Sequence, residues 1–375
     1  GSLVYASPAV SDGLVFIPSW DGILYVLDEN TGQLKWSFNT GAPIFASPAV
    51  SSGTVFVASR NGILYALNEQ SGGLVWNCPG VACKLNYPIT SSPLIANGKV
   101  FFGSWCGGGL CNPAGHFVAL DAGTGAFLWP SAATPSASVV SSPSIHNGHV
   151  FFGEDDGTVV SLNETDGKAV WSVVPSGTVF VRTSPAVANG ILLFGTANSF
   201  LALDETTGVT HWAFNTGGAN ATSAAISSGI VYFGTGDGRV LALNATTGAA
   251  KWPSPGTTSA GVSSSPALSL GSGVLYVGSN DHYLYALNAT DGTRLWRYST
   301  GAPVVSSPAV ADGRVFFGSL DNSIYALGPV LPKLQVSFSS SASALRSGGV
   351  STLTTTVSNA SSPISGATLV FTSSL

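Results

Sequence analysis

The densest group of acidic side chains in the sequence is the segment GEDDGT, residues 153–158, which contains Glu154, Asp155 and Asp156. Hard cations such as Ca²⁺ prefer clustered carboxylate oxygens, so this segment could form a calcium loop. The same residues also suit a solvated hairpin turn, because Asp-Gly pairs accept the positive φ angles that tight turns need. Of the two interpretations we favour the turn.

A histidine pair, His146 and His149, flanks an Asn-Gly turn in the segment IHNGH. Two imidazoles can bind a metal ion, but a zinc site needs further ligands, and the sequence around the pair offers none. An exposed turn explains the pair without a metal. The motifs of serine hydrolases, zinc proteases and phosphate-binding loops do not occur in a suitable context. The sequence therefore predicts no catalytic residue, no metal ligand and no cofactor.

The four cysteines form two pairs with C-x4-C spacing, Cys78 with Cys83 and Cys106 with Cys111. An even number of cysteines in an oxidising compartment indicates two disulfides. Zinc is the alternative, but neither pair has C-x2-C spacing and the flanks CPGVAC and CGGGLC contain no histidine. Which cysteine bonds to which is left open.

Five N-x-S/T sequons could carry glycans on the surface of the protein: Asn163, Asn220, Asn244, Asn288 and Asn359. Alternatively, Asn163, Asn244 and Asn288 recur at one turn position, where an Asn side chain caps its own backbone. The sequence begins with Gly and contains no Met, which predicts that a signal peptide or pro-segment was removed. With the cysteines, these features predict a secreted, extracellular or cell-surface protein.

The elements that position these residues come from an internal repeat. A Ser-Pro pair begins most copies, at Ser7-Pro8, Ser47-Pro48, Ser92-Pro93, Ser142-Pro143, Ser184-Pro185, Ser265-Pro266 and Ser307-Pro308, with a degenerate copy at 221–229. Each copy continues through three short strands separated by Gly-containing turns, then a T-G turn and a strand that carries a tryptophan. No segment shows a sustained helical period. Four short antiparallel strands every ~40 residues predict an all-β, eight-bladed β-propeller.

The tryptophans of the repeat lie nine residues after the Leu of the third strand, as from Leu67 to Trp76. Such a Trp buries about 150–250 Å², so one per copy is predicted to act as a wedge between neighbouring blades. The predicted docking residues are Trp36, Trp76, Trp129, Trp171, Trp212, Trp252 and Trp296.

The pattern Ala-x-Asp/Asn-x-x-Thr-Gly-x-x-x-Trp, found at 202–212 and 242–252, resembles the tryptophan-docking motif of pyrroloquinoline-quinone (PQQ)-type eight-bladed propellers. The resemblance spans residues 1–328 and predicts a propeller domain over 1–330. It implies two classes of relative. The quinoprotein dehydrogenases hold PQQ and calcium and contain an adjacent Cys-Cys disulfide, which this sequence lacks. The propeller lipoprotein of the barrel-assembly machine is not an enzyme, but its lipid-anchoring Cys has no counterpart near the N-terminus here.

The eighth copy, residues 307–327, has three predicted strands and no tryptophan. Val336 lies nine residues past Leu327, but Pro329 and Pro332 occupy the place of the usual turn. The fourth strand of the last blade should therefore come from before Gly1, from residues 333–338 or from another molecule.

Residues 331–375 resemble the start of a bacterial immunoglobulin-like repeat, with strands predicted at 334–340, 350–358 and 366–373. A complete domain of this kind needs about 7 strands, so this part is cut short or completed by another chain. Strand donation between subunits is one way to complete it, since an open sheet edge can pair with a foreign strand.

A candidate ligand-binding face follows from the predicted propeller. Turns between second and third strands lie on the same face as the links between blades, and this face should carry Trp20, Trp105 and Arg182. Exposed aromatic residues in concave loops can bind sugars or peptides, although each Trp could instead fold over its own blade.

The charge balance limits the partners. Only 8% of residues are charged and the net charge is −5, with no basic cluster for a nucleic acid or an anionic membrane. No apolar run is long enough to span a bilayer.

The sequence as a whole predicts a non-catalytic, secreted structural or interaction module that binds other protein subunits. One form of such a module is a fibre subunit joined by strand donation through the C-terminal tail. The alternatives are a glycan- or peptide-binding module and, less favoured, a PQQ-dependent dehydrogenase.

Overall fold

The computed structural model describes residues 3–78, 87–105, 115–129, 135–178, 180–217 and 219–328, and the backbone of 334–340, 353–359 and 362–363. The chain divides into two compact units, Gly1–Leu327 and Gly328–Leu375, and each is described by itself. Every regular element of the described residues is a strand. They include no helix with the length and hydropathy needed to cross a bilayer.

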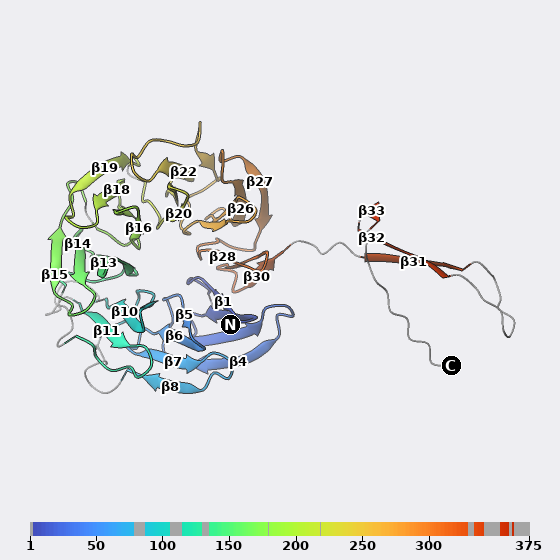
Figure 1. Ribbon diagram of the computed structural model, residues 1–375, viewed down its shortest axis with the longest axis horizontal. Helices are drawn as coiled ribbons and strands as arrows, with labels where there is room; N and C mark the ends of the chain where they lie inside the picture. Colours follow the sequence, from blue (N-terminus) through green and yellow to red (C-terminus); the bar gives the residue numbers. More distant parts are fainter. Residues whose placement is uncertain are drawn as a thin grey trace. The chain divides into compact units, whose positions relative to one another are not determined.

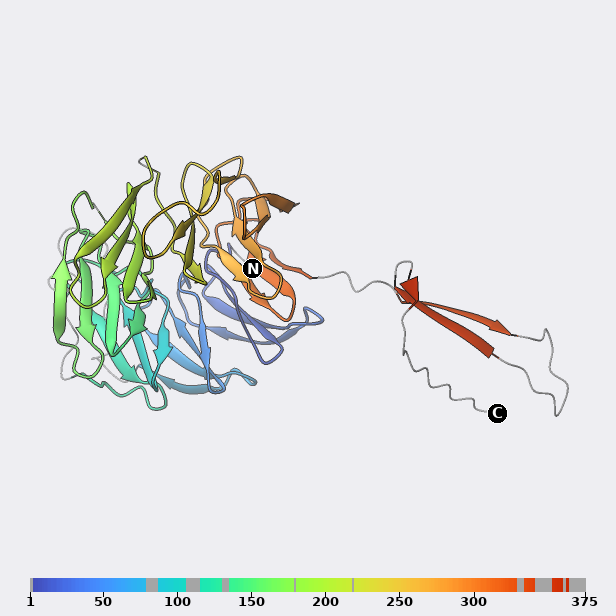
Figure 2. The ribbon, with the colours of Figure 1, turned by 45° about the horizontal axis from the view of Figure 1, so that its top comes forward.

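The first unit is a ring of eight antiparallel sheets, or blades (Figure 1). Figure 2 shows the blades standing side by side around the ring. The prediction of an all-β, eight-bladed propeller is therefore confirmed.

Within a blade, consecutive strands pair in chain order, from the inside of the ring outwards (Figure 1). Blade 1 comprises β1 (Ala9–Ser11), β2 (Leu14–Pro18), β3 (Ile23–Asp28) and β4 (Leu34–Asn39); blade 2 comprises β5 (Ala49–Ser51), β6 (Thr54–Ala58), β7 (Leu64–Asn68) and β8 (Leu74–Asn77). Blade 3 comprises β9 (Leu94–Ala96), β10 (Lys99–Gly103) and β11 (Phe117–Asp121); blade 4 comprises β12 (Ser144–His146), β13 (His149–Gly153), β14 (Val159–Asn163) and β15 (Ala169–Val173).

The second half of the ring follows the same order. Blade 5 comprises β16 (Ala186–Ala188), β17 (Ile191–Gly195), β18 (Ser199–Asp204) and β19 (Thr210–Asn215); blade 6 comprises β20 (Ala225–Ser227), β21 (Ile230–Gly234), β22 (Arg239–Asn244) and β23 (Gly256–Thr257). Blade 7 comprises β24 (Ala267–Ser269), β25 (Val274–Gly278), β26 (Tyr283–Asn288) and β27 (Arg294–Ser299); blade 8 comprises β28 (Ala309–Ala311), β29 (Arg314–Gly318) and β30 (Ile324–Leu327).

The first hairpin of each blade is set by its turn residues. In blade 1, Asp12 and Gly13 both have positive φ angles, 45° and 75°, and Asn147 and Gly148 repeat this in blade 4 with 48° and 76°. Two successive positive φ angles define the turn whose twist matches a two-stranded antiparallel ribbon, and Asn-Gly and Asp-Gly adopt it at least cost.

The hydrophobic core lies between neighbouring blades. One buried cluster joins Phe16 and Leu24 of blade 1 to Val55 and Leu67 of blade 2, and similar clusters recur around the ring. At the closing joint, Val4, Val15 and Ile17 pack with Phe316 of blade 8. Because each sheet buries both faces against its neighbours, a blade cannot form this core alone.

The Ser of each Ser-Pro pair bonds one blade to the next at the inner end of the sheets. Its backbone N–H donates to the hydroxyl of the corresponding serine one blade further on, at 2.8–3.1 Å, in the pairs Ser7–Ser47, Ser47–Ser92, Ser92–Ser142, Ser142–Ser184, Ser184–Ser223, Ser265–Ser307 and Ser307–Ser7. The last pair joins the final blade to the first. The serine ring, as we call these residues, explains why the Ser-Pro pair repeats.

The prediction that every Trp of the repeat lies in a fourth strand is wrong for Trp129 and Trp252. In blade 3 the outer edge is the single bridge Leu120–Phe127, and in blade 6 Trp252 precedes the short β23. In both cases the next residue is a proline, Pro130 or Pro253, which has no N–H for the ladder. Blade 8 has three strands within the described residues.

The second unit contains a sheet of three strands in the order β31 (Leu334–Ser340), β32 (Leu353–Asn359) and β33 (Ser362–Pro363). The first two match predicted strands, and the third predicted strand, 366–373, lies outside the described residues. The immunoglobulin-like assignment stays a prediction.

Candidate functional site

The docking tryptophans contact the following blade in two ways, through a hydrogen bond from the indole N–H and through packing of the indole ring on a glycine. The indole N–H of each donates to a backbone carbonyl of the next blade, 3.0–3.2 Å away, in the pairs Trp36–Glu69, Trp76–Ala122, Trp129–Glu164, Trp171–Glu205, Trp212–Ala245 and Trp252–Ala289. The ring also covers the Gly of the next T-G turn, so that a Cβ on Gly72 would lie 2.5 Å from the indole of Trp36. Trp296 is 40% exposed and its indole donates no hydrogen bond within the described residues.

The predicted disulfide residues are only partly described. Cys78 is buried and disulfide-bonded, whereas Cys83, Cys106 and Cys111 lie outside the described residues. The predicted pairing stays a prediction.

The sequons occupy two kinds of place. Asn163, Asn244 and Asn288 are the last residues of third strands, and each Oδ1 accepts a backbone N–H two residues on, at 2.8–3.0 Å. Asn220 is exposed in a link between blades, and nothing is described of the side chain of Asn359. Glycosylation stays a prediction.

The acidic cluster forms a structured hairpin turn. Glu154 is buried, and its Oε2 accepts hydrogen bonds from Ser136 Oγ (2.7 Å) and Ala137 N (2.9 Å). Burial raises the pKa of Glu154 above its ordinary value. Asp156 caps Thr158 N at 3.0 Å, and Asp155 pairs with Arg182. Among the described residues no group of three or more His, Cys, Asp or Glu side chains could hold a metal ion.

The two histidines of the IHNGH turn have separate partners. His146 Nδ1 lies 2.6 Å from Glu205 Oε2 of the next blade, and Asn147 Nδ2 donates to the other oxygen of the same carboxylate. His149 instead contacts the ring of Phe151. His146 and Asn147 therefore help to join blades 4 and 5, whereas His149 packs within blade 4.

The connection between the second and third strands differs in sequence and length from blade to blade, but its second residue is held in one way. In blades 1 to 4 and 6 to 8 the backbone N–H of this residue donates to a carbonyl of the entering link, at 2.8–3.1 Å. In blade 2, Ser59 begins the turn, Asn61 Oδ1 accepts the N–H of Ile63 at 3.0 Å, and Gly62 has a positive φ. The residue between Ser59 and Asn61 is Arg60, whose N–H donates to Pro43 O of the entering link. The same position holds Trp20, Trp105 and Asp155 in blades 1, 3 and 4, and Ala197, Gly236, Asn280 and Leu320 in blades 5 to 8.

Five side chains from these turns and the adjoining links form a continuous row, the loop-face ladder: Tyr5, Trp20, Phe45, Arg60 and Trp105. The ring centroids of Tyr5 and Trp20 are 5.3 Å apart, and those of Trp20 and Phe45 are 4.3 Å apart. The guanidinium of Arg60 lies 5.0 Å from the Phe45 centroid and 5.6 Å from the Trp105 centroid. A guanidinium between two rings gains cation–π stabilisation and still has N–H donors for a ligand.

A hollow adjoins the ladder. The loop-face hollow has a volume of about 380 Å³ and is lined by Phe45, Arg60, Thr90, Trp105, Val140, Asp155 and Arg182. Arg182 Nε donates to Asp155 Oδ1 at 2.8 Å, and the Arg182 guanidinium lies over the Phe180 ring. The site thus combines flat apolar faces with fixed N–H donors, which suits a ligand having both an apolar face and polar groups.

Of the residues predicted for the ligand face, Trp105 and Arg182 line the hollow, and Trp20 is connected to it through Phe45 and Arg60. Sequence reasoning missed Tyr5, Phe45 and Arg60. The repeat contained the signal: Arg60 aligns with Trp20 and Trp105 in the turn, and Tyr5 and Phe45 each lie two residues before a Ser-Pro pair.

This fold, with its repeated docking tryptophans, defines the PQQ-type class of β-propeller. A family model described as outer membrane protein assembly factor BamB matches residues 2–129, 113–266 and 256–330, and the chain belongs to this family. No curated protein matches the chain in a sequence comparison.

Solved structures share the fold at low identity. A computationally designed protein, Ika8, is 18% identical with a TM-score of 0.74, covering 87% of this chain and 96% of that chain. BamB from Moraxella catarrhalis is 20% identical with a TM-score of 0.68, covering 86% and 96%. Quinohemoprotein alcohol dehydrogenase from Comamonas testosteroni is 17% identical with a TM-score of 0.66, covering 84% and 70%.

The residues of the loop-face hollow do not fit the PQQ and calcium set that the resemblance to quinoproteins implies. Calcium needs several oxygen ligands, and the carboxylate that lines the hollow, Asp155, is paired with Arg182. The neighbouring Glu154 is buried and accepts hydrogen bonds from Ser136 and Ala137.

Proposed function

We propose that this chain is a non-catalytic propeller that acts as a structural and interaction module of an extracellular or cell-surface assembly and binds its partner at the loop-face ladder. One observation supports this most directly: at the second residue after the second strand, blades 1 to 4 carry Trp20, Arg60, Trp105 and Asp155, and the first three belong to one ladder. The family to which the chain belongs supports the proposal too, because the description of its model names an assembly factor.

The ligand class that fits the ladder is a glycan or an extended peptide. Both offer an apolar face that stacks on an indole and polar groups that accept hydrogen bonds from arginine. The uncharged Ser/Thr-rich surface, with only 8% charged residues, supports an extracellular setting.

Binding is tested by glycan and peptide arrays with the full chain, followed by titration of any ligand found. Trp105→Ala should weaken binding at least about tenfold, because a contacting indole contributes more than about 1.4 kcal/mol. Leu270→Ala is the matched control, since Leu270 is 77% exposed in a turn of blade 7. Binding that is unaffected by Trp105→Ala and by Arg60→Ala would end this assignment of the ladder.

A fibre subunit joined by strand donation is a second candidate, and the specific observation that favours it is the exposed outer strand of blade 8. Ala326 on β30 is exposed, whereas Ala66, Ala202 and Ala286 at the same repeat position are 0% exposed. Electron microscopy of native material tests it, and strictly monomeric particles would count against it.

A PQQ-dependent dehydrogenase is a further alternative, because solved structures that share the fold include a quinohemoprotein alcohol dehydrogenase. Adding PQQ and calcium to the full chain and following dye reduction with alcohols and sugars tests it directly. We expect no reduction above the protein-free background.

A further inference from the structure

Within the described residues, the joint between blades 8 and 1 lacks the docked tryptophan that the six joints from blades 1–2 to blades 6–7 have. Gly32 of blade 1 occupies the position of Gly72 and Gly248, where a Cβ would meet the indole of the preceding blade at 2.5 and 2.8 Å, but a Cβ on Gly32 would meet nothing within 4 Å. Leu27 is half-buried, whereas Leu67 at the same position is 0% exposed.

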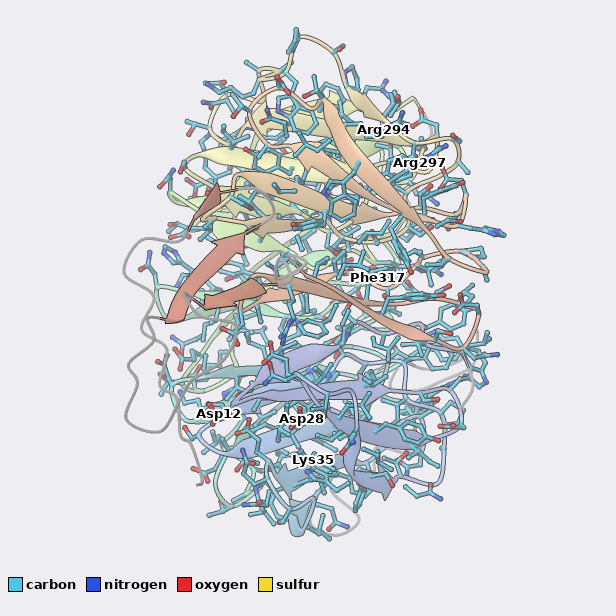
Figure 3. The ribbon with its side chains drawn as sticks, turned by 90° about the vertical axis from the view of Figure 1, so that its right-hand side faces the viewer. Asp12, Asp28, Lys35, Arg294, Arg297 and Phe317 are labelled. Carbon is cyan, nitrogen blue, oxygen red and sulfur yellow. The ribbon has the colours of Figure 1, made fainter. Side chains whose placement is uncertain are left out.

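Two adjoining hollows lie along this joint, lined by residues of both blades. One, of about 340 Å³, is lined by residues that include Leu27, Glu29, Gly32, Ile324 and Ala326. The other, of about 190 Å³, is lined by residues that include Ile17, Tyr25, Leu27 and Ile324. We call the two together the seam. Figure 3 shows this side of the ring: Arg294 and Arg297 of blade 7 lie on one side of Phe317, and Asp28 and Lys35 of blade 1 lie on the other.

The repeat specifies what would fill the seam. In blade 1 the fourth strand pairs Trp36 with Val26, and Phe38 packs on Tyr65 of blade 2 with ring centroids 5.2 Å apart. A fourth strand in blade 8 would therefore place its central residue opposite Ala326 and direct it at Gly32. It would place an aromatic residue, two positions later, against Tyr25.

This chain contains a segment with that pattern. The sequence LQVSFSS of β31 aligns with LKWSFNT at 34–40, with Leu, Ser and Phe identical and Val336 in place of Trp36. Val336 lies nine residues past Leu327, the spacing from Leu27 to Trp36. Among the described strands of the second unit β31 lies at the edge of its sheet and pairs with β32 alone, so its other edge has no partner within the described residues.

The segment cannot return to its own blade through the turn that the other blades use. In blade 1 that turn needs Gly32, which has φ of 69° and donates its N–H to Asp28 O at 2.9 Å. Pro332 stands at the corresponding position, and proline has φ near −65° and no N–H. Gly328 also replaces Asp28, whose carboxylate accepts hydrogen bonds from the turn.

We propose that the seam binds the segment 334–340 of a second copy of this chain as the fourth strand of blade 8, with Val336 opposite Ala326 and Phe338 against Tyr25. This inference rests on the proposed assembly function and identifies the contact between subunits that the assembly would use. Donor segment and acceptor seam are different surfaces, so the contact is head-to-tail and generates rings or open filaments.

A mixing experiment with single cysteines separates a second copy from the same chain. Full chains carrying Ala326→Cys are mixed with full chains carrying Val336→Cys under mild oxidation, and products are identified on non-reducing gels and by mass spectrometry of the linked peptides. Residues directly opposite each other on paired strands have Cβ atoms about 4.5–5.5 Å apart. The expected product is a covalent dimer with a 326–336 disulfide.

The matched control pairs Leu270→Cys with Val336→Cys and should give no dimer. Two results would overturn the proposal: no 326–336 link, or a link formed within one chain of the double variant while the mixed single variants give none. Assemblies that persist without a 326–336 link would reject this contact and leave the proposed function standing. A chain that is monomeric at every concentration would count against both.

A second variant tests the seam by gain of binding. Val336→Trp restores the side chain that docks in the other blades, so the association constant measured by analytical ultracentrifugation should rise about tenfold or more, because a buried indole adds more than about 1.4 kcal/mol over valine. An unchanged or lower association constant would contradict the proposed register.

Discussion

The last residue of the third strand, Asp204 in blade 5 and Asn244 in blade 6, holds the T-G turn of its docking hairpin. Its side-chain oxygen matters more for this turn than its charge. Asp204 Oδ1 accepts hydrogen bonds from Thr207 Oγ1 and from the N–H groups of Thr206 and Thr207, at 2.8–3.0 Å. Asn244 makes the same three contacts with Thr246 and Thr247. The hydrogen bonds from Thr207 hold the pKa of Asp204 below its ordinary value of 3.8.

Replacing Asp204 with Asn should therefore change acid stability alone. A carboxyl with a lowered folded-state pKa stabilises the fold above its unfolded pKa and loses this contribution as pH falls through the folded pKa. The melting temperature of Asp204→Asn should equal that of the parent near pH 7 and increasingly exceed it as the pH falls below about 4. Thermal unfolding followed by circular dichroism checks this, and a large loss near pH 7 would show that the charge itself is required.

At the scale of the element, the tryptophan of a docking hairpin is held in place only where the next blade offers a backbone carbonyl that accepts the indole N–H. Trp212 donates to Ala245 O and packs with Phe200, at a centroid distance of 6.3 Å. Trp296 ends the series, with a similar ring contact to Tyr276 but 40% exposure and no hydrogen-bond acceptor among the described residues. The two residues thus have the same sequence signature and different surroundings.

Alanine at these two positions should separate the docked from the undocked tryptophan. Trp212→Ala should lower the free energy of unfolding by about 3 kcal/mol, because a half-buried aromatic side chain is removed together with its hydrogen bond to the next blade. Trp296→Ala should cost less than about 1 kcal/mol. Urea unfolding of the full chain measures both changes, and equal losses would contradict the docking described here.

The docking hairpins also show how far sequence reasoning extends. The repeat predicted the ring, its strand order and the spacing of the hairpins, because these follow from local turn chemistry and from the need of each sheet to bury both faces. It did not predict that Trp129 and Trp252 lie outside a fourth strand, although the prolines that follow them, Pro130 and Pro253, indicated it. The loop-face ladder was predicted only at Trp20, Trp105 and Arg182. Tyr5, Phe45 and Arg60 join it by contacts across blades, which spacing along one blade does not reveal.

At the scale of the whole molecule, the closing joint depends on its inner contacts. Ser307 N donates to Ser7 Oγ at 3.0 Å, and Val4 packs so closely on Gly318 that a Cβ there would clash with it. The joint between blades 2 and 3 has the corresponding bond from Ser47 N to Ser92 Oγ and, in addition, the docked Trp76. Within the described residues, the closing joint has no docked tryptophan, so the serine ring bears more of its stability.

Removing one serine hydroxyl at each joint should expose this difference. Ser7→Ala and Ser92→Ala each leave a half-buried N–H, of Ser307 or Ser47, without its acceptor, at a cost of about 1–3 kcal/mol. Hydrogen exchange should reveal more local opening of β1 and β28 in Ser7→Ala, because no docked tryptophan among the described residues helps to keep those blades together when the bond is lost. In Ser92→Ala the docked Trp76 should keep the exchange of β5 and β9 near that of the parent. Equal exchange at the two joints would contradict this, and would mean that the remaining contacts of the closing joint, such as Arg314 Nη1 with Asn30 Oδ1 at 2.9 Å, hold it as firmly as a docked tryptophan does.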